Sequence, residues 1–204
     1  VAAWCFAYAT TGDEQYYERA RRALDVMLMF HDVPAATFTA AGFAPGFITR
    51  SLVRSDEGAV FDDKASQPNW HLQEWEGQTY YWKDDTSSDE YTGHFLGIPV
   101  FYDLCAKSEE EREAIRTRMA SVMRYLEQGE YALIDLDGEP TAHGDWKGLA
   151  NGVDGLTNCA GAGLDECGES FAGGGWLNSV EILGALLATW HMTGDDHWYD
   201  EYER

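Results

Sequence analysis

The densest group of residues that could carry chemistry lies between Gln78 and His94, where aromatic, carboxylate and imidazole side chains follow one another closely. Asp85 and Asp89 are four residues apart, and Asp85 precedes the expected start of a helix. Two carboxyl groups in different surroundings can divide into an acid and a base, as cleavage of a glycosidic bond requires. His94 could relay protons or hold a sugar hydroxyl. We therefore expect Asp85, Asp89 and His94 to be catalytic.

The same residues also have a structural interpretation. Ser87 and Glu90 have the spacing of a capping box, and Asp89 in the first helical turn is favourable with the helix dipole. Oxygen ligands from Asp84, Asp85 and Ser87 could instead hold calcium. Catalysis, helix capping and a calcium site therefore remain open from the sequence.

Further side chains could bind a sugar substrate. Aromatic rings stack on sugar rings, polar groups hydrogen-bond their hydroxyls, and a guanidinium suits a carboxylated or sulfated sugar. The structural alternatives are a folded loop anchored by Trp146 and a surface ion pair for Arg50. The expected substrate-binding residues are Arg50, Tyr81, Trp82, Lys83, His143, Asp145 and Trp146.

A repeated joint indicates the elements that position these residues. Thr-Gly-Asp occurs at 11–13 and at 193–195, each time after an apolar segment. The glycine suits the left-handed position that ends a helix, and the aspartate suits the N-cap of the next one. A weaker third copy has Ser108 as cap and Glu111 completing a capping box.

The joints divide the chain into helical hairpins with long excursions. The spacing of apolar residues predicts outer helices over 13–32 and 108–128 and inner helices over 88–106 and 176–192. The excursions, 33–87 and 130–175, would place their loops on one face of a layered α/α toroid. We expect few strands: a hairpin over 132–142 that turns at Asp137-Gly138, and an irregular pair within 43–61.

Three segments resemble six-hairpin glycosidase-like proteins: Pro45-Gly-Phe-Ile-Thr-Arg50, Trp82-Lys-Asp-Asp-Thr-Ser-Ser-Asp-Glu-Tyr-Thr-Gly-His-Phe95 and Leu133-Ile-Asp-Leu-Asp-Gly-Glu-Pro-Thr141. The resemblance covers most of the chain. It implies a mainly α fold of the (α/α)₆ toroid type, whose members act on glycans with residues at the mouths of the inner helices. The chain has room for about three of the six hairpins, so we expect residues 1–204 to be one domain that is part of a larger toroid.

Composition excludes several classes of partner. With 14 basic and 36 acidic residues, the net charge of −22 repels nucleic acids and anionic membranes. The sequence contains no run of about 18 apolar residues, which is the length that a helix needs to span a bilayer.

Cys159 and Cys167 flank a glycine-rich loop and could form a disulfide or stay free, whereas Cys5 and Cys105 lie in apolar helical segments. An extracellular or periplasmic location is expected.

The sequence leaves three readings of function open. The first is a glycoside hydrolase that uses paired carboxylates and needs no cofactor, although calcium could bind. The second is a non-catalytic glycan-binding or structural module, in which the same carboxylates cap helices or bind calcium. The third is a lyase acting on a uronate-containing glycan. A second copy of the chain, or a missing remainder of the same domain, is an expected partner.

Overall fold

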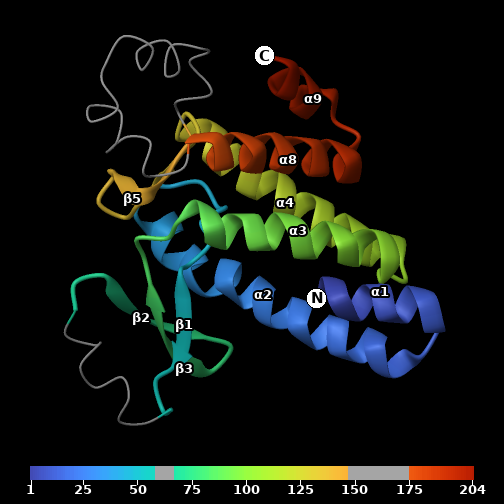
Figure 1. Ribbon diagram of the computed structural model, residues 1–204. Coiled ribbons are helices and arrows are strands. Elements are labelled where there is room, and N and C mark those ends of the chain that lie inside the picture. Colours follow the sequence, from blue (N-terminus) through green and yellow to red (C-terminus); the bar gives the residue numbers. More distant parts are fainter. Residues whose placement is uncertain (58–66, 147–174) are drawn as a thin grey trace.

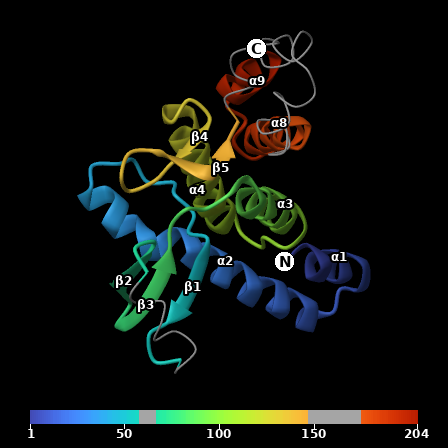
Figure 2. The same cartoon turned by 60° about the vertical axis from the view of Figure 1, so that its left-hand side comes forward.

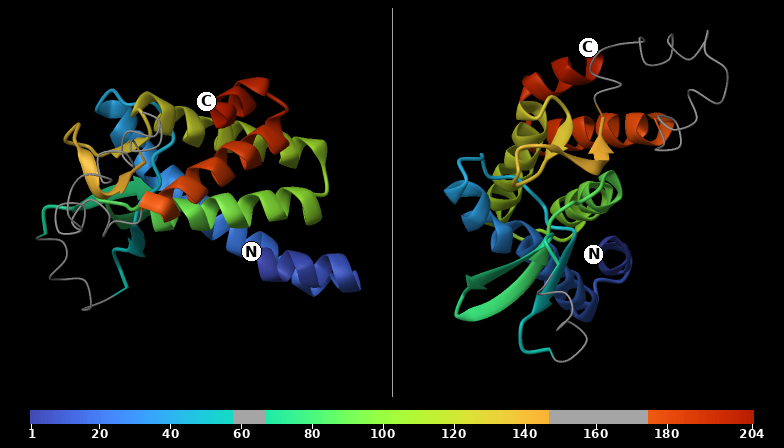
Figure 3. Two further views of the ribbon diagram at one scale, coloured as in Figure 1. Left: turned by 45° about the horizontal axis from the view of Figure 1, so that its top comes forward. Right: turned by 90° about the vertical axis from the view of Figure 1, so that its left-hand side faces the viewer.

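The computed structural model describes residues 1–57, 67–146 and 175–204, and the chain is mainly α-helical with a few short strands (Figure 1). Its helices are α1 (Ala2–Thr11), α2 (Glu14–Ala40), α3 (Ser88–Leu104), α4 (Glu109–Gln128), α8 (Gly175–Thr193) and α9 (Asp196–Glu203). The helices α1, α3 and α8 lie side by side, and each is followed by an antiparallel partner (Figure 3). Among the described helices, none combines the length and hydrophobicity needed to cross a membrane.

Short joints connect the helices at one end of this layer, which we call the turn end: residues 12–13, 105–108 and 194–195. The two predicted Thr-Gly-Asp joints are confirmed. Gly12 and Gly194 adopt φ of 69° and 65°, and the carboxylates of Asp13 and Asp195 accept hydrogen bonds from backbone N–H groups two residues later. A left-handed glycine followed by a capping aspartate thus closes both hairpins.

The third joint differs in one detail from the expected capping box. The hydroxyl of Ser108 accepts from the backbone N–H of Glu111 at 3.1 Å, as predicted. The Glu111 carboxylate accepts from the N–H of Lys107 at 2.9 Å, one residue before the cap. Helix α4 begins where it was expected, and the Glu111 carboxylate is hydrogen-bonded to the turn that precedes the helix.

Helix α2 continues eight residues beyond its predicted end at Asp32. Pro34 predicts a helix end because it lacks an N–H, which leaves the carbonyl of residue 30 without its helical donor. Here the backbone N–H of Thr49 donates to that carbonyl of Phe30 at 3.0 Å. Since Val33, Pro34 and Phe38 are buried, tertiary packing keeps the last turns helical.

The opposite end of the layer, which we call the insertion end, carries two small sheets (Figure 2). The first has the order β1-β3-β2, with all pairs antiparallel: β1 (Ser51–Arg54), β2 (Trp70–Trp75) and β3 (Gln78–Lys83). β2 and β3 form a hairpin that turns at Glu76 and Gly77, both with positive φ. Of the strand pair expected within 43–61, the described residues 43–57 include β1, which pairs with the distant β3, and residues 58–61 lie outside the described residues.

The second sheet confirms the hairpin predicted over 132–142. It consists of β4 (Ala132–Ile134) and β5 (Pro140–Asp145), and Gly138 in the turn has a φ of 85°. An isolated bridge between Ser87 and His143 places β5 beside the start of α3. The hairpin therefore reaches the region in which the sequence predicts the catalytic residues.

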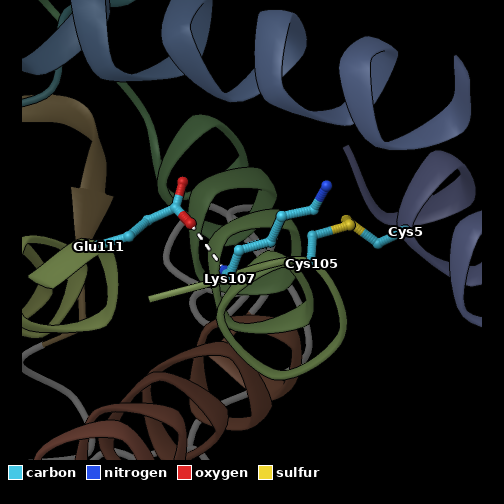
Figure 4. Close-up of a disulfide and its surroundings, with 4 residues drawn as sticks. All are labelled: Cys5, Cys105, Lys107 and Glu111. Atoms are coloured by element: carbon cyan, nitrogen blue, oxygen red, sulfur yellow. Dashed lines mark hydrogen bonds between the residues drawn. A yellow bond between two sulfur atoms is a disulfide. The ribbon is translucent and has the colours of Figure 1, made fainter. Parts of the chain in front are cut away.

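The structure joins Cys5 to Cys105 in a buried disulfide (Figure 4). The bond links α1 to the residue that ends α3, with 5.7 Å between the two Cα atoms. The sequence analysis placed the two cysteines in separate apolar helices and did not pair them, because a contact between residues 100 positions apart leaves no local sign in the sequence. The pair considered there, Cys159 and Cys167, lies outside the described residues.

Candidate functional site

Charged side chains from four segments meet where β3 leads into α3. We call this group the junction cluster: Arg50, His71, Asp84, Asp85, Glu90 and Asp135. The chain turns sharply here, because Asp85 adopts a positive φ of 48°, a conformation that costs most residues energy but that aspartate tolerates better than most. The segment between β3 and α3 thus places Asp84 and Asp85 near the β4–β5 hairpin, which contacts the backbone of Asp85 through Asp135.

Asp135 lies after β4 and holds this turn in place. Its Oδ2 accepts from the backbone N–H of Asp85 at 2.8 Å, and its Oδ1 accepts from that of Leu136 at 2.8 Å. Burial raises the pKa of the Asp135 carboxyl, and the charges of Asp84 and Asp137 act in the same direction, whereas the two backbone hydrogen bonds oppose the shift. A carboxyl group with a raised pKa can retain a proton for transfer to a leaving group.

Asp84 is buried and is oriented by a histidine from the neighbouring strand. Nε2 of His71 lies 2.5 Å from Oδ2 of Asp84. The His71 ring packs against Trp82, with 4.4 Å between ring centroids. The pair therefore has a fixed orientation beside Asp135, whose pKa responds to the charge of Asp84.

Arg50 provides a cationic group among these carboxylates. Its Nη1 donates to the backbone carbonyl of Asp85 at 2.9 Å and lies 3.7 Å from that residue's Oδ2. Its Nε lies 3.6 Å from Oε1 of Glu90. The guanidinium thus contacts protein groups on two sides, while 31% of the side chain stays exposed.

Ser87 and Glu90 form the predicted capping box of α3. The Glu90 carboxylate accepts from the backbone N–H of Ser87 at 2.8 Å. Asp89, on the same helical turn, is exposed to solvent. The carboxylate of Asp135 is directly linked to the backbone N–H of Asp85.

His94 points away from the junction cluster and pairs with a histidine of α2. Its Nδ1 lies 2.9 Å from Nε2 of His31, and both rings are buried. Burial lowers the pKa of His94 to about 4 and that of His31 well below its usual value. Nδ1 of His31 has no hydrogen-bond partner. The structure therefore places His94 in the interface between α2 and α3.

The aromatic residues expected to bind substrate divide into two groups. Trp82 and Trp146 are 0% and 3% exposed, so their rings belong to the core, although neither indole N–H has a hydrogen-bond partner among the described residues. Tyr81 and Lys83 are half-buried, and His143 is exposed beside Ser87. Only this second group can meet a sugar at the surface. Asp145 ends β5, and its side chain lies outside the described residues.

Three residues near the site were missed by the sequence analysis: His71, Asp135 and Glu181. Asp135 was noticed only as part of a hairpin, and His71 stands on a strand that was not predicted. Glu181 of α8 and Trp146 line a cavity of about 10 Å³ between α3 and α8, enough for about one water molecule. Oε2 of Glu181 has no hydrogen-bond partner among the described residues. The sequence shows Glu181 only as a polar residue in an apolar helix, and this was the one signal that could have drawn attention to it.

The junction carboxylates do not bring three ligand atoms together. Within the described ranges, the group of His and carboxylate residues whose ligand atoms lie within 4.8 Å of one another consists of Glu127, His197 and Glu201, in α4 and α9. Calcium binding by Asp84, Asp85 and Ser87 remains a prediction.

The comparisons with known proteins return no relative. No protein-family model, curated protein or solved structure matches the chain. The geometry of the junction cluster is therefore the basis for a functional proposal.

Proposed function

We propose that the protein is a glycoside hydrolase that acts on a polysaccharide or oligosaccharide at the junction cluster. Asp135 serves as the general acid and Asp85 as the partner carboxylate. The observation that carries this proposal is the hydrogen bond between Asp135 and the backbone of Asp85, which brings together a carboxyl of raised pKa and a second, half-exposed carboxylate. Two such groups in different surroundings are what acid and base catalysis of glycoside cleavage requires.

This proposal changes the roles expected from the sequence. Asp135 takes the place of Asp89 in the pair of carboxylates, because Asp89 is exposed and Asp135 is half-buried. His94 has no catalytic role in it, since the ring is paired with His31. Tyr81, Lys83 and His143 are the exposed or half-exposed side chains available for contacts with sugar.

The layered hairpins support the wider interpretation. We infer that α1–α2, α3–α4 and α8–α9 are three hairpins of an α/α toroid, because three inner helices stand side by side and short joints alternate with long insertions. We also infer an extracellular or periplasmic location, which the Cys5–Cys105 disulfide supports because such bonds persist in oxidising compartments.

The test is an assay of the protein with neutral and uronate-containing polysaccharides, reading both reducing ends and absorbance of unsaturated uronates. We expect reducing ends without absorbance, and a loss of about 100-fold or more in Asp135→Asn, because general acid catalysis contributes rate factors of about that size. The control is Asp103→Asn, an exposed aspartate near the turn end that pairs with His191. Its activity should equal that of the unaltered protein.

A comparison of variants separates the two assignments of the acid. If Asp89→Asn loses activity and Asp135→Asn retains it, the pair is Asp85 and Asp89, and our assignment is wrong. Absorbance of unsaturated uronates in place of simple hydrolysis would establish the lyase.

A non-catalytic glycan-binding or structural module is the second candidate, and a specific observation favours it. Glu90 is engaged in the capping box and Arg50 in contacts with Asp85 and Glu90, so these groups already serve the fold. Such a module would show no turnover across the panel. Melting that depends on calcium would then assign the carboxylates to a structural site.

A further inference from the structure

A second group of ionisable residues lies away from the junction cluster, where the last turn of α4 meets α9. Glu127 comes from α4, and His197 and Glu201 stand one helical turn apart on α9. Their ligand atoms lie within 4.8 Å of one another, and Nε2 of His197 is 2.9 Å from Oε1 of Glu127. The i, i+4 spacing on a helix directs both side chains to one side.

The surrounding hydrogen bonds orient the Glu201 carboxylate. The hydroxyl of Tyr131 donates to its Oε2 at 2.7 Å, and Nη2 of Arg204 lies 2.8 Å from the same atom. Oε1 of Glu201 has no such contact among the described residues and stays available as a ligand. Outer partners of this kind are typical of carboxylates that bind metals.

A pocket of about 70 Å³ lies next to this group and is lined by Glu201 and by its two partners, Tyr131 and Arg204. Its other walls are mainly apolar side chains of α8 and α9, together with Trp146. This volume can hold more than one water molecule. A metal held by three protein groups would therefore have room for water or another small ligand at its remaining positions.

We propose that Glu127, His197 and Glu201 form a binding site for one divalent transition-metal ion, with Zn²⁺ as the best fit. One imidazole and two carboxylates are nitrogen and oxygen ligands that Zn²⁺ accepts, and the pocket supplies the open position of a three-ligand site. The ion replaces the contact between His197 and Glu127. Arg204, whose side chain is 69% exposed, turns toward solvent when the ion binds.

The test is calorimetric titration of the full chain with Zn²⁺, using a background with Cys159→Ser and Cys167→Ser so that thiols do not contribute. We expect one ion per chain and a rise in Tm with added Zn²⁺. His197→Gln and Glu201→Gln should each weaken binding by about 100-fold, and Tyr131→Phe by about tenfold through loss of the outer hydrogen bond.

The matched control is His191→Gln. His191 also stands on a helix and pairs with a carboxylate, Asp103, at 2.8 Å, but it has no third ligand nearby among the described groups. Its removal should leave Zn²⁺ binding unchanged. Equal losses in His191→Gln and His197→Gln, or Zn²⁺ binding that survives both His197→Gln and Glu201→Gln in folded protein, would overturn the proposal.

Discussion

The turn end and the insertion end of the helical layer differ in how their polar groups are hydrogen-bonded. At the turn end, Thr11 and Thr193 accept from the N–H of the aspartate two residues later, and that aspartate caps the next helix. Among the described residues of the insertion end, four buried polar atoms have no hydrogen-bond partner: Nε1 of Trp82 and Trp146, and Oγ1 of Thr86 and Thr141. Near the turn end the same is true of Nε1 of Trp198, which lies just after the joint at 194–195.

Each end also has its own apolar cluster. The turn-end cluster includes Cys5, Leu24, Phe101 and Met119, and the insertion-end cluster includes Trp82 and Tyr91 together with buried residues from α2, α4 and α8. Unpaired buried polar groups cost stability and are usually explained by water, a ligand or a functional role. The comparison therefore teaches that local capping satisfies the backbone at the turn end, whereas unpartnered buried polar atoms are more numerous at the insertion end.

The largest expected effect on stability comes from the disulfide near the turn end. Cys5→Ser should lower the free energy of unfolding by about 2 to 5 kcal/mol, because the bond closes a long loop between α1 and the end of α3. The measurement is urea denaturation of Cys5→Ser and the unaltered protein under oxidising conditions. An unchanged free energy of unfolding in Cys5→Ser would mean that this end does not depend on the Cys5–Cys105 bond.

The buried histidine pair should make the stability depend on pH. The pKa of His94 falls from 6.5 to about 4 on folding, so between these values the folded state binds fewer protons than the unfolded state. The stabilisation is complete above pH 6.5 and is lost as the pH falls toward 4, amounting to about 3 kcal/mol for His94.

Urea denaturation from pH 7 to pH 4 measures this dependence. His94→Gln should flatten the curve, whereas His191→Gln, which alters an exposed histidine of α8, should leave it as steep. If both variants gave the same curve as the unaltered protein, the acid sensitivity would arise from other groups.

Substitution of one glycine at each end should give a smaller difference in stability between the two ends. A Cβ at Gly46 would lie 2.5 Å from Cβ of Tyr125 and 2.6 Å from the carbonyl oxygen of Ser121, whereas one at Gly12 would meet nothing within 4 Å. Both residues have positive φ. Gly46→Ala should therefore cost about 2 kcal/mol more than Gly12→Ala, because overpacking adds to the backbone strain.

Thermal melting of the two variants measures the difference. Similar Tm values would show that the loop at Gly46 can move aside. The insertion end would then be less tightly packed against α4 than its contacts indicate.

The sequence predicts the helical hairpins well for a local reason. Gly12, Asp13, Ser108, Gly194 and Asp195 act within a few residues of their own position, so their spacing alone indicates the joints. The same holds for the turn at Gly138. By contrast, the end of α2 was misplaced because the N–H of Thr49 satisfies the carbonyl that Pro34 leaves free.

The candidate site could be predicted only in part. Asp85 was singled out because carboxylates cluster beside a helix start, and Asp135 was not, because its contact with Asp85 joins residues 50 apart. His94 was expected to be catalytic and Trp82 to bind substrate on the basis of residue type, yet the two side chains are buried against α2 and β2. Residue type does not reveal which face of a helix or strand becomes the core.

The sequence by itself determined the mainly α class, the joints and the strongly acidic surface charge, since these depend on composition and on contacts within a few residues. Tertiary structure decided which cysteines pair, which histidine is buried and which carboxylate gains a raised pKa. Those properties depend on desolvation and on neighbours distant in the chain, because the free energy of a charge is set by what surrounds it in space.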